Sequence, residues 1–205
     1  MFGQRTVILT AAIIFSGYAA HASDDSARPY REPAANYLRQ FAEDDGQVFV
    51  LERFDANGRL VKRSVDKLSA KVSIDSATDR TIAGRKIRLR GLTGCPTEKV
   101  IYNRQQMWAC LDAARDYAGT IYNERASVIL CKTLVLRPED DQPLPSSCFA
   151  LVGGQGEPFR IVNDDDSMVF LGLAAIERTA DGQSRRPDLE GTQALSQSMG
   201  FQNAQ

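Results

Sequence analysis

The segment from Thr78 to Glu98, TDRTIAGRKIRLRGLTGCPTE, constrains the fold of this chain more than any other stretch. It predicts a strand, a turn at Ala83-Gly84, a second strand over Arg85 to Leu92, and a loop that closes at Cys95-Pro96. We therefore expect a β-hairpin at the centre of the fold, followed by a loop that a cysteine can tie down.

The second strand of this hairpin has two contrasting faces. Because successive strand side chains point to opposite sides of a sheet, Ile87 and Leu89 share a mostly apolar face. The opposite face is wholly cationic and consists of Lys86, Arg88 and Arg90, here called the cationic stripe. This stripe is either the solvated face of a strand or an anion-binding surface.

The N-terminus predicts export. Arg5 is followed by an apolar run over Val7 to Phe15 and by Ala20-His21-Ala22, which is the pattern of a secretory signal peptide over residues 1–22. The apolar run is too short to span a bilayer, so we expect no membrane span after cleavage and a periplasmic or secreted protein. The mature chain would have 205 − 22 = 183 residues, a net charge of 24 − 26 = −2 and no histidine. Histidine-based general base catalysis and histidine metal ligation are thereby excluded.

Four cysteines remain in the mature chain, and an even number in an exported protein favours two disulfides. Three pairings are possible. We favour Cys95 with Cys110 and Cys131 with Cys148, because each pair closes a short local loop that contributes about 3 kcal/mol in the chain-entropy model.

The pattern along the chain predicts an N-terminal arm and hairpin over residues 23–69 and a main domain over residues 70–205. The hairpin alternates apolar residues on both sides of Asn57-Gly58. In the main domain, helical spacing predicts a helix over residues 104–118 that stops at Gly119. Short helices are expected over residues 168–177 and 187–201, and strands over the remaining apolar segments, which together indicate an α+β fold.

Several ordered segments resemble the staphylococcal-nuclease (thermonuclease) family over residues 70 to 201. The resemblance implies an OB-fold, a five-stranded β-barrel with packed helices, preceded here by the β-hairpin. It extends to exported members from rhizobia that are assigned to succinoglycan (exopolysaccharide) biosynthesis, which are similar in size, signal peptide and cysteine layout. The matching segments are Thr81-Ile82 with Gly84 to Gly91, Trp108 to Cys110 with Ala113-Ala114, Val128 to Cys131, Gly172 to Ala174, and Glu190 with Gly200-Phe201.

The family's nuclease chemistry requires two aspartates for calcium, two phosphate-binding arginines and a glutamate as candidate base. Arg88 matches the first arginine, whereas Arg80 and Thr93 stand where the two aspartates are expected. A slip of one residue in the turn would instead bring Asp79 to the metal, and Glu98 is the candidate base. The second arginine has no counterpart in the loop before Cys148, which reads DDQPLPSS.

These matches favour a degenerate active site, and no cofactor is expected unless nuclease activity, and with it calcium, is retained. We expect an accessory role in succinoglycan synthesis, in which the cationic stripe binds an anionic polysaccharide or the chain binds an envelope protein. Nucleic acid is a less suitable partner for a chain of net charge −2. The alternatives are a secreted metal-dependent nuclease that uses Arg88 and Glu98, and a structural envelope protein. The acidic run Asp164 to Asp166 is interpreted as a solvated loop, because the spacing of a calcium loop is missing.

Overall fold

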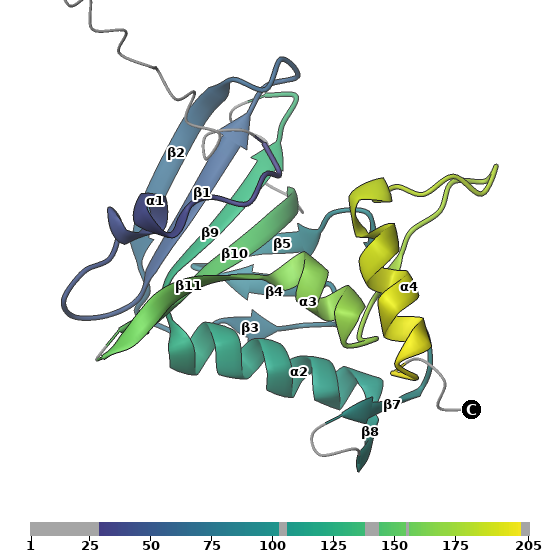
Figure 1. The fold of residues 1–205 in the computed structure, drawn as a ribbon. Coiled ribbons are helices and arrows are strands. Elements are labelled where there is room, and N and C mark those ends of the chain that lie inside the picture. Colours follow the sequence, from purple (N-terminus) through teal and green to yellow (C-terminus); the bar gives the residue numbers. More distant parts are fainter. Residues whose placement is uncertain (1–28, 103–105, 138–143, 155, 202–205) are drawn as a thin grey trace, which may run out of the picture.

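The computed structural model describes residues 29–102, 106–137, 144–154 and 156–201, and it shows an α+β fold built on one mixed sheet (Figure 1). The signal peptide predicted for residues 1–22 lies outside the described residues. The strands are β1 (Val48–Phe54), β2 (Leu60–Lys67), β3 (Ser73–Ile74), β4 (Asp79–Ile82), β5 (Arg85–Leu89), β6 (Leu92–Thr93), β7 (Lys99–Tyr102), β8 (Gln106–Ala109), β9 (Ala126–Leu134), β10 (Leu144–Gly154), β11 (Glu157–Asn163) and β12 (Ala175–Ile176). The helices are α1 (Ala35–Arg39), α2 (Cys110–Thr120), the π-helix η2 (Ile121–Arg125), α3 (Asp164–Phe170), the 3₁₀ helix η3 (Pro187–Leu189) and α4 (Glu190–Ser198).

The predicted N-terminal hairpin is present as the antiparallel pair β1 and β2, joined by a turn that contains Gly58 at a φ of 74°. Asp55 stabilises this turn, because its carboxylate accepts hydrogen bonds from the backbone N–H groups of Asn57 and Arg59. Strand β1 also pairs in parallel with β9, from Val48 opposite Val128 to Phe54 opposite Leu134. The hairpin is therefore an extension of the main sheet, and the domain boundary at residue 70 stays a prediction.

The predicted central hairpin is present as β4 and β5, with the expected turn at Ala83 and Gly84, both of which have positive φ. The main sheet has the order β2-β1-β9-β10-β5-β4-β3, and β5 runs parallel to the start of β10. Strand β11 pairs with the later part of β10, from Phe149 to Gly154. Among the described residues β3 pairs with β4, and the free side of β9 is taken by β1. The five-stranded barrel of an OB-fold stays a prediction.

The central helix differs from its predicted bounds. Residues 106–109 form β8, which pairs with β7, and α2 begins only at Cys110. Trp108 lies opposite Val100 in this small hairpin. Residues 106–109 therefore alternate as a strand does, although the spacing of apolar residues from Met107 onward suggested a helix. The helix also passes Gly119, because α2 ends at Thr120 and continues directly into η2.

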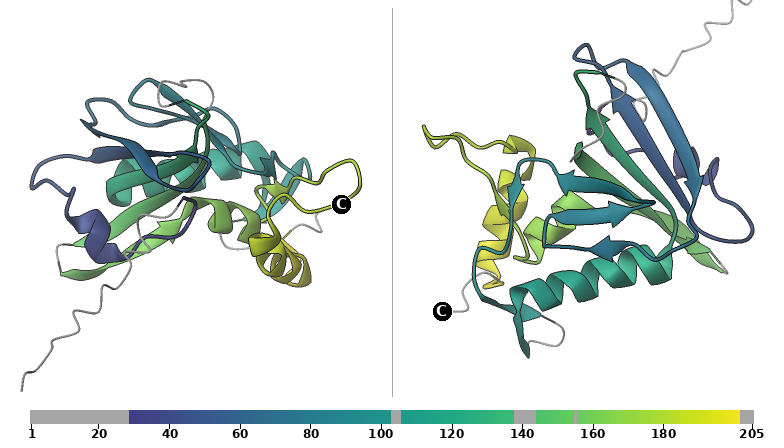
Figure 2. Two further views of the ribbon diagram at one scale, coloured as in Figure 1. Left: turned by 90° about the horizontal axis from the view of Figure 1, so that it is seen from above. Right: turned by 180° about the vertical axis from the view of Figure 1, so that it is seen from behind.

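The C-terminal part contains more loop than predicted. Residues 168–177 were expected to be helical, but α3 ends at Phe170 and residues 175–176 form β12, which pairs with β6. Residues 187–201 contain η3 and α4 as expected, and α4 packs against α3. Figure 2 shows α3 and α4 gathered at one end of the molecule and α2 running beside β3. No helix within the described ranges is long and apolar enough to cross a membrane.

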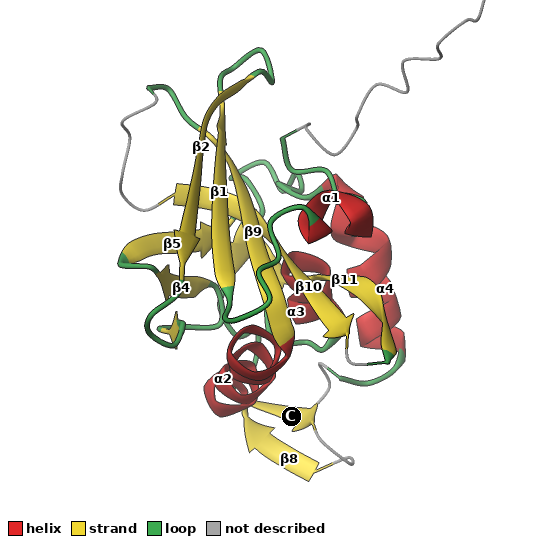
Figure 3. Cartoon of the chain, turned by 90° about the vertical axis from the view of Figure 1, so that its left-hand side faces the viewer, coloured by secondary structure: helices red, strands yellow, loops and turns green. Residues whose placement is uncertain are grey.

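The core lies on both sides of the central strands. Phe49 and Leu51 of β1 contact the main cluster, whereas Val48 and Val50 contact a second cluster beneath α1. In Figure 3, α1 lies on one side of β1 and β9, and β4 and β5 lie on the other. A strand that is buried on both faces needs a continuous apolar sequence, which explains the fully buried start of β1.

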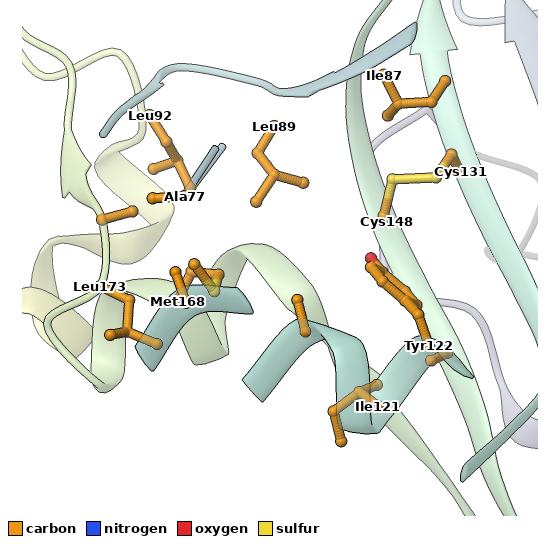
Figure 4. Packing of buried hydrophobic residues seen from close by; sticks show 14 of the residues in the cluster. Ala77, Ile87, Leu89, Leu92, Ile121, Tyr122, Cys131, Cys148, Met168 and Leu173 are labelled. Carbon is orange, nitrogen blue, oxygen red and sulfur yellow. A yellow bond between two sulfur atoms is a disulfide. The ribbon is translucent and has the colours of Figure 1, made fainter. Parts of the chain in front are cut away.

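Both predicted disulfides are confirmed. Cys131 and Cys148 lie opposite each other in β9 and β10, with their Cα atoms 4.2 Å apart, and this bond is buried in the main cluster beside Ile87 (Figure 4). Cys95 and Cys110 join the loop after β6 to the first residue of α2. The second bond fixes the start of the helix against the end of the hairpin segment.

Candidate functional site

Strand β5 presents part of the cationic stripe to solvent. Ile87 and Leu89 are buried in the main cluster, and the period of a strand therefore places Lys86 and Arg88 on the exposed side. Arg90 departs from the prediction. The strand ends at Leu89, and the half-buried guanidinium of Arg90 stacks on the ring of Tyr30, with its Cζ 3.9 Å from the ring centroid.

Arg88 forms an ion pair with Asp79 across the two strands. The residues are direct partners in the β4–β5 register, and Arg88 Nε donates to Asp79 Oδ1 at 2.7 Å. Burial alone would raise the pKa of Asp79, but hydrogen bonds from Arg88 and Ser76 outweigh this effect and lower that pKa. The side chain of Arg88 remains more than half exposed, at 55%, so it can still contact a ligand.

Arg88 lines two hollows. The first, here called the arginine pocket, has a volume of about 400 Å³ and combines the end of β5 with Glu177 and Arg185 from the segment before η3. The second has a volume of about 690 Å³ and mixes both charge signs. The polar residues of the second hollow are Asp75, Ser76, Asp79, Arg80, Thr81, Lys86 and Arg88.

Beneath the second hollow, Arg80 belongs to a buried ion pair. Its Nη2 lies 3.2 Å from Asp164 Oδ2, and the two side chains are 0% and 2% exposed. Arg80 Nη1 donates to the carbonyls of Ser76 and Asp79, and the hydroxyl of Tyr122 donates to Asp164 Oδ2 at 2.8 Å. A buried charge is tolerated only with such compensation, so the side chain of Arg80 has a structural role.

A second buried ion pair supports the arginine pocket. Arg186 Nη1 donates to Asp165 Oδ2 at 2.6 Å and to the carbonyl of Arg90 at 3.0 Å. Ser147 donates to the same carboxylate oxygen, and Asp188 accepts from the other side of the guanidinium. Burial would lower the pKa of Arg186, but the hydrogen bonds and charges of Asp188 and Asp165 raise it.

The interpretation of Asp164 to Asp166 as a solvated loop is wrong. Asp164 and Asp165 are buried at the start of α3, where each compensates one buried arginine from a distant segment. Asn163 caps this helix, because its side chain accepts from the backbone N–H of Asp166. Carboxylates at a helix N-terminus are also favoured by the helix dipole.

The positions that the family resemblance assigns to calcium ligands do not fit a calcium ion, which takes six to eight oxygen ligands. Arg80 is held in its buried ion pair. The side-chain hydroxyl of Thr93 donates a hydrogen bond to the carbonyl of Ala175. The carboxylate of Asp79, the predicted metal ligand, accepts from Arg88 and Ser76. Within the described part of the chain, no group of three or more histidine, cysteine, aspartate or glutamate side chains could hold a metal.

Glu98, the candidate base, is exposed in the loop before β7 and is not among the residues that line either hollow. The structure thus brings Arg88 together with Asp79 and Lys86, but leaves Glu98 outside this set. Arg185 and Tyr30 join the site without having been predicted, since their positions depend on contacts with residues far away in the sequence.

Comparison with known proteins adds no assignment. No family model matches the sequence, and a search of curated proteins finds no significant match.

Proposed function

We propose that this chain is an exported relative of the thermonuclease family that has no nuclease activity and serves exopolysaccharide (succinoglycan) synthesis by binding the acidic polymer. The observation that carries the proposal is the position of Arg88, an exposed cation shared by two hollows, with Lys86 and Arg185 beside it. Guanidinium groups bind carboxylate and phosphate oxygens with two parallel hydrogen bonds, and such oxygens are the acidic groups of a charged polymer.

The fold supports this relationship in its order of strands. Strands β3, β4, β5, β10 and β9 are consecutive neighbours in the sheet, and they would be the five strands of the proposed OB-fold. OB-folds bind oligonucleotides and oligosaccharides on a strand face. The exposed side of β5 would be that face here, with the N-terminal hairpin added at the edge of β9.

The two disulfides support an extracytoplasmic location, because thiols are kept reduced in the cytosol. Together with the predicted signal peptide, they favour the periplasm or the exterior, where an exopolysaccharide is assembled or released. An envelope protein is the other partner compatible with this location.

An acidic polysaccharide suits this surface better than a nucleic acid. The mature chain has a net charge of 24 − 26 = −2, so long-range attraction to any polyanion is absent and binding must rely on the local stripe. The arginine pocket is lined by arginine, leucine, glycine, proline and glutamate residues, and the neighbouring ring of Tyr30 already carries the guanidinium of Arg90, so this lining offers a base no aromatic ring to stack on.

Two assays on the purified mature protein test the proposal. Incubation with DNA or RNA and calcium or magnesium should give no cleavage, and cleavage that Arg88→Ala abolishes would show the nuclease function instead. Titration with succinoglycan should show binding at low salt that weakens near an ionic strength of about 0.15 M, where the Debye length is about 8 Å. Dextran, a neutral glucan, should not bind.

A pair of matched variants locates the binding surface. Lys86→Glu/Arg88→Glu reverses two exposed charges on β5, whereas Arg59→Glu/Lys62→Glu makes the same charge change on the N-terminal hairpin. The first double variant should lose polymer binding and the second should retain it. Equal losses in both would mean that net charge, and not the cationic stripe, drives the interaction.

A further inference from the structure

Among the described residues, one arginine of the arginine pocket forms no direct ion pair with a carboxylate. Arg88 is paired with Asp79, and Arg185 Nε lies 3.3 Å from Glu177 Oε1. Arg90 differs from both, because its Nε is buried and has no hydrogen-bond partner among the described residues. Burial and the neighbouring charge of Arg186 lower the pKa of Arg90, and the more distant charges of Asp188 and Asp165 offset this effect only in part.

The guanidinium of Arg90 is held in place from one side. Tyr30 stacks on it, and the hydroxyl of Tyr30 accepts from the backbone N–H of Leu134. Tyr30 has a φ of 61°, a left-handed conformation that is rare for a residue with a side chain. A strained backbone conformation of this kind persists only where the surrounding contacts fix it. We infer that the ring of Tyr30 has a fixed position beneath the guanidinium of Arg90.

Arg185 is positioned by its neighbour in the sequence. Arg186 is anchored by Asp165 and by the carbonyl of Arg90, which holds this segment against the end of β5. The approach is close at Gly91, where an added Cβ would lie 2.9 Å from Arg186 Cγ and 3.2 Å from Arg185 Cβ. Gly91 also has a φ of 62°, so a side chain there would both strain the backbone and push Arg185 away.

We propose that the arginine pocket binds one anionic sugar unit, whose carboxylate or phosphate is held between Arg90 and Arg185 with Arg88 at the rim. This inference rests on the proposed function and assigns recognition of the acidic polymer to one subsite. The pocket volume of about 400 Å³ is near the lower end of ligand pockets, which suits a single sugar unit. Three arginines and Glu177 line the pocket, and Asp79 pairs with Arg88 from β4, so these five side chains have a charge balance of 3 − 2 = +1, which favours a single compact anion.

Isothermal titration calorimetry with monomeric probes tests the subsite. Glucuronate supplies a carboxylate, glucose 6-phosphate supplies a phosphate, and glucose is the neutral control. At least one of the two anions should bind, glucose should not, and the stronger anion identifies the source of the charge. If succinoglycan binds but neither anionic monomer does, the subsite is refuted while the proposed function stands. If neither the polymer nor the monomers bind, both are refuted.

Arg185→Gln and Arg178→Gln are the matched variants for this test. Both arginines are about half exposed (53% and 51%), both pair with a glutamate, and Arg178 does not line the arginine pocket. Arg185→Gln should weaken anion binding about tenfold, as expected when a charge-assisted contact is lost, and Arg178→Gln should leave it unchanged. Gly91→Ala should weaken binding as well. Equal affinity in Arg185→Gln and the unaltered protein, with both folded by circular dichroism, would overturn the proposal.

Discussion

Replacing Asp164 with asparagine should destabilise the protein strongly, because the change leaves Arg80 buried without a countercharge. The guanidinium and carboxylate are 3.2 Å apart and almost completely buried. At an effective dielectric constant of about 20, 332/(20 × 3.2) gives an attraction of roughly 5 kcal/mol, most of which offsets desolvation of the pair. Breaking a buried pair by removing one partner costs about 3–5 kcal/mol, and we expect a loss of this size for Asp164→Asn.

Urea unfolding, followed by circular dichroism with the disulfides intact, measures this effect and its origin. Arg80→Met should also destabilise, and the double variant should lose about 2 kcal/mol less than the sum of the single losses, because neither charge is then left alone. Arg178→Gln breaks a half-exposed pair at 3.8 Å and should cost less than about 1 kcal/mol. An equally small loss for Asp164→Asn, or strictly additive losses, would refute a structural ion pair at Arg80.

Three further predictions concern titration and covalent stability. The pKa of Asp79, followed by NMR, should lie below 3.8 and should rise in Arg88→Gln, and an unchanged pKa in the variant would argue against the ion pair. Because the pKa is lowered in the folded state, the pair stabilises the fold above the pKa of the unfolded chain, and this contribution is lost as the pH falls through the folded-state pKa. Replacing Cys131 and Cys148 together with alanine should lower the free energy of unfolding by about 3 kcal/mol for a separation of 17 residues, and unchanged stability by urea titration would contradict this. Burial raises the pKa of Tyr122 well above 10.0, whereas the same tyrosine in the unfolded chain titrates near 10. The free energy of unfolding should therefore fall as the pH rises past 10, and the urea midpoint of Tyr122→Phe should fall less steeply with pH than that of the unaltered protein.

The sequence predicted those elements whose signal is local. The Asn57-Gly58 turn and the Ala83-Gly84 turn each lie between alternating strands, and both hairpins are present. The favoured disulfides are also present, because each joins cysteines only 15 or 17 residues apart. These features need no knowledge of distant contacts.

The sequence could not predict the start of α2 or the end of β5, because partners elsewhere decide them. Residues 106–109 form a strand because they pair with β7, although the spacing of their apolar residues also suits a helix. Arg90 follows the alternation of β5, but the strand ends before it and Tyr30 covers its guanidinium. In both cases tertiary contacts override a local period.

The largest difference concerns the acidic residues after β11. Asp164 contacts Arg80 over a separation of 84 residues, and Asp165 contacts Arg186 over 21. Nothing local distinguishes these carboxylates from a solvated acidic loop, since burial of a charge is visible only when its partner is known. The same holds for Arg185, whose place in the arginine pocket depends on the anchoring of Arg186.

The central claim is that an acidic polymer binds at the end of β5, and NMR of the arginine side-chain Nε–H groups tests it most directly. Adding short acidic fragments of succinoglycan should shift the resonances of Arg88, Arg90 and Arg185, which line the arginine pocket. Resonances of Arg59 and Arg125, which do not line it, should stay in place. Shifts confined to those two arginines, or no shift at low salt, would contradict the account.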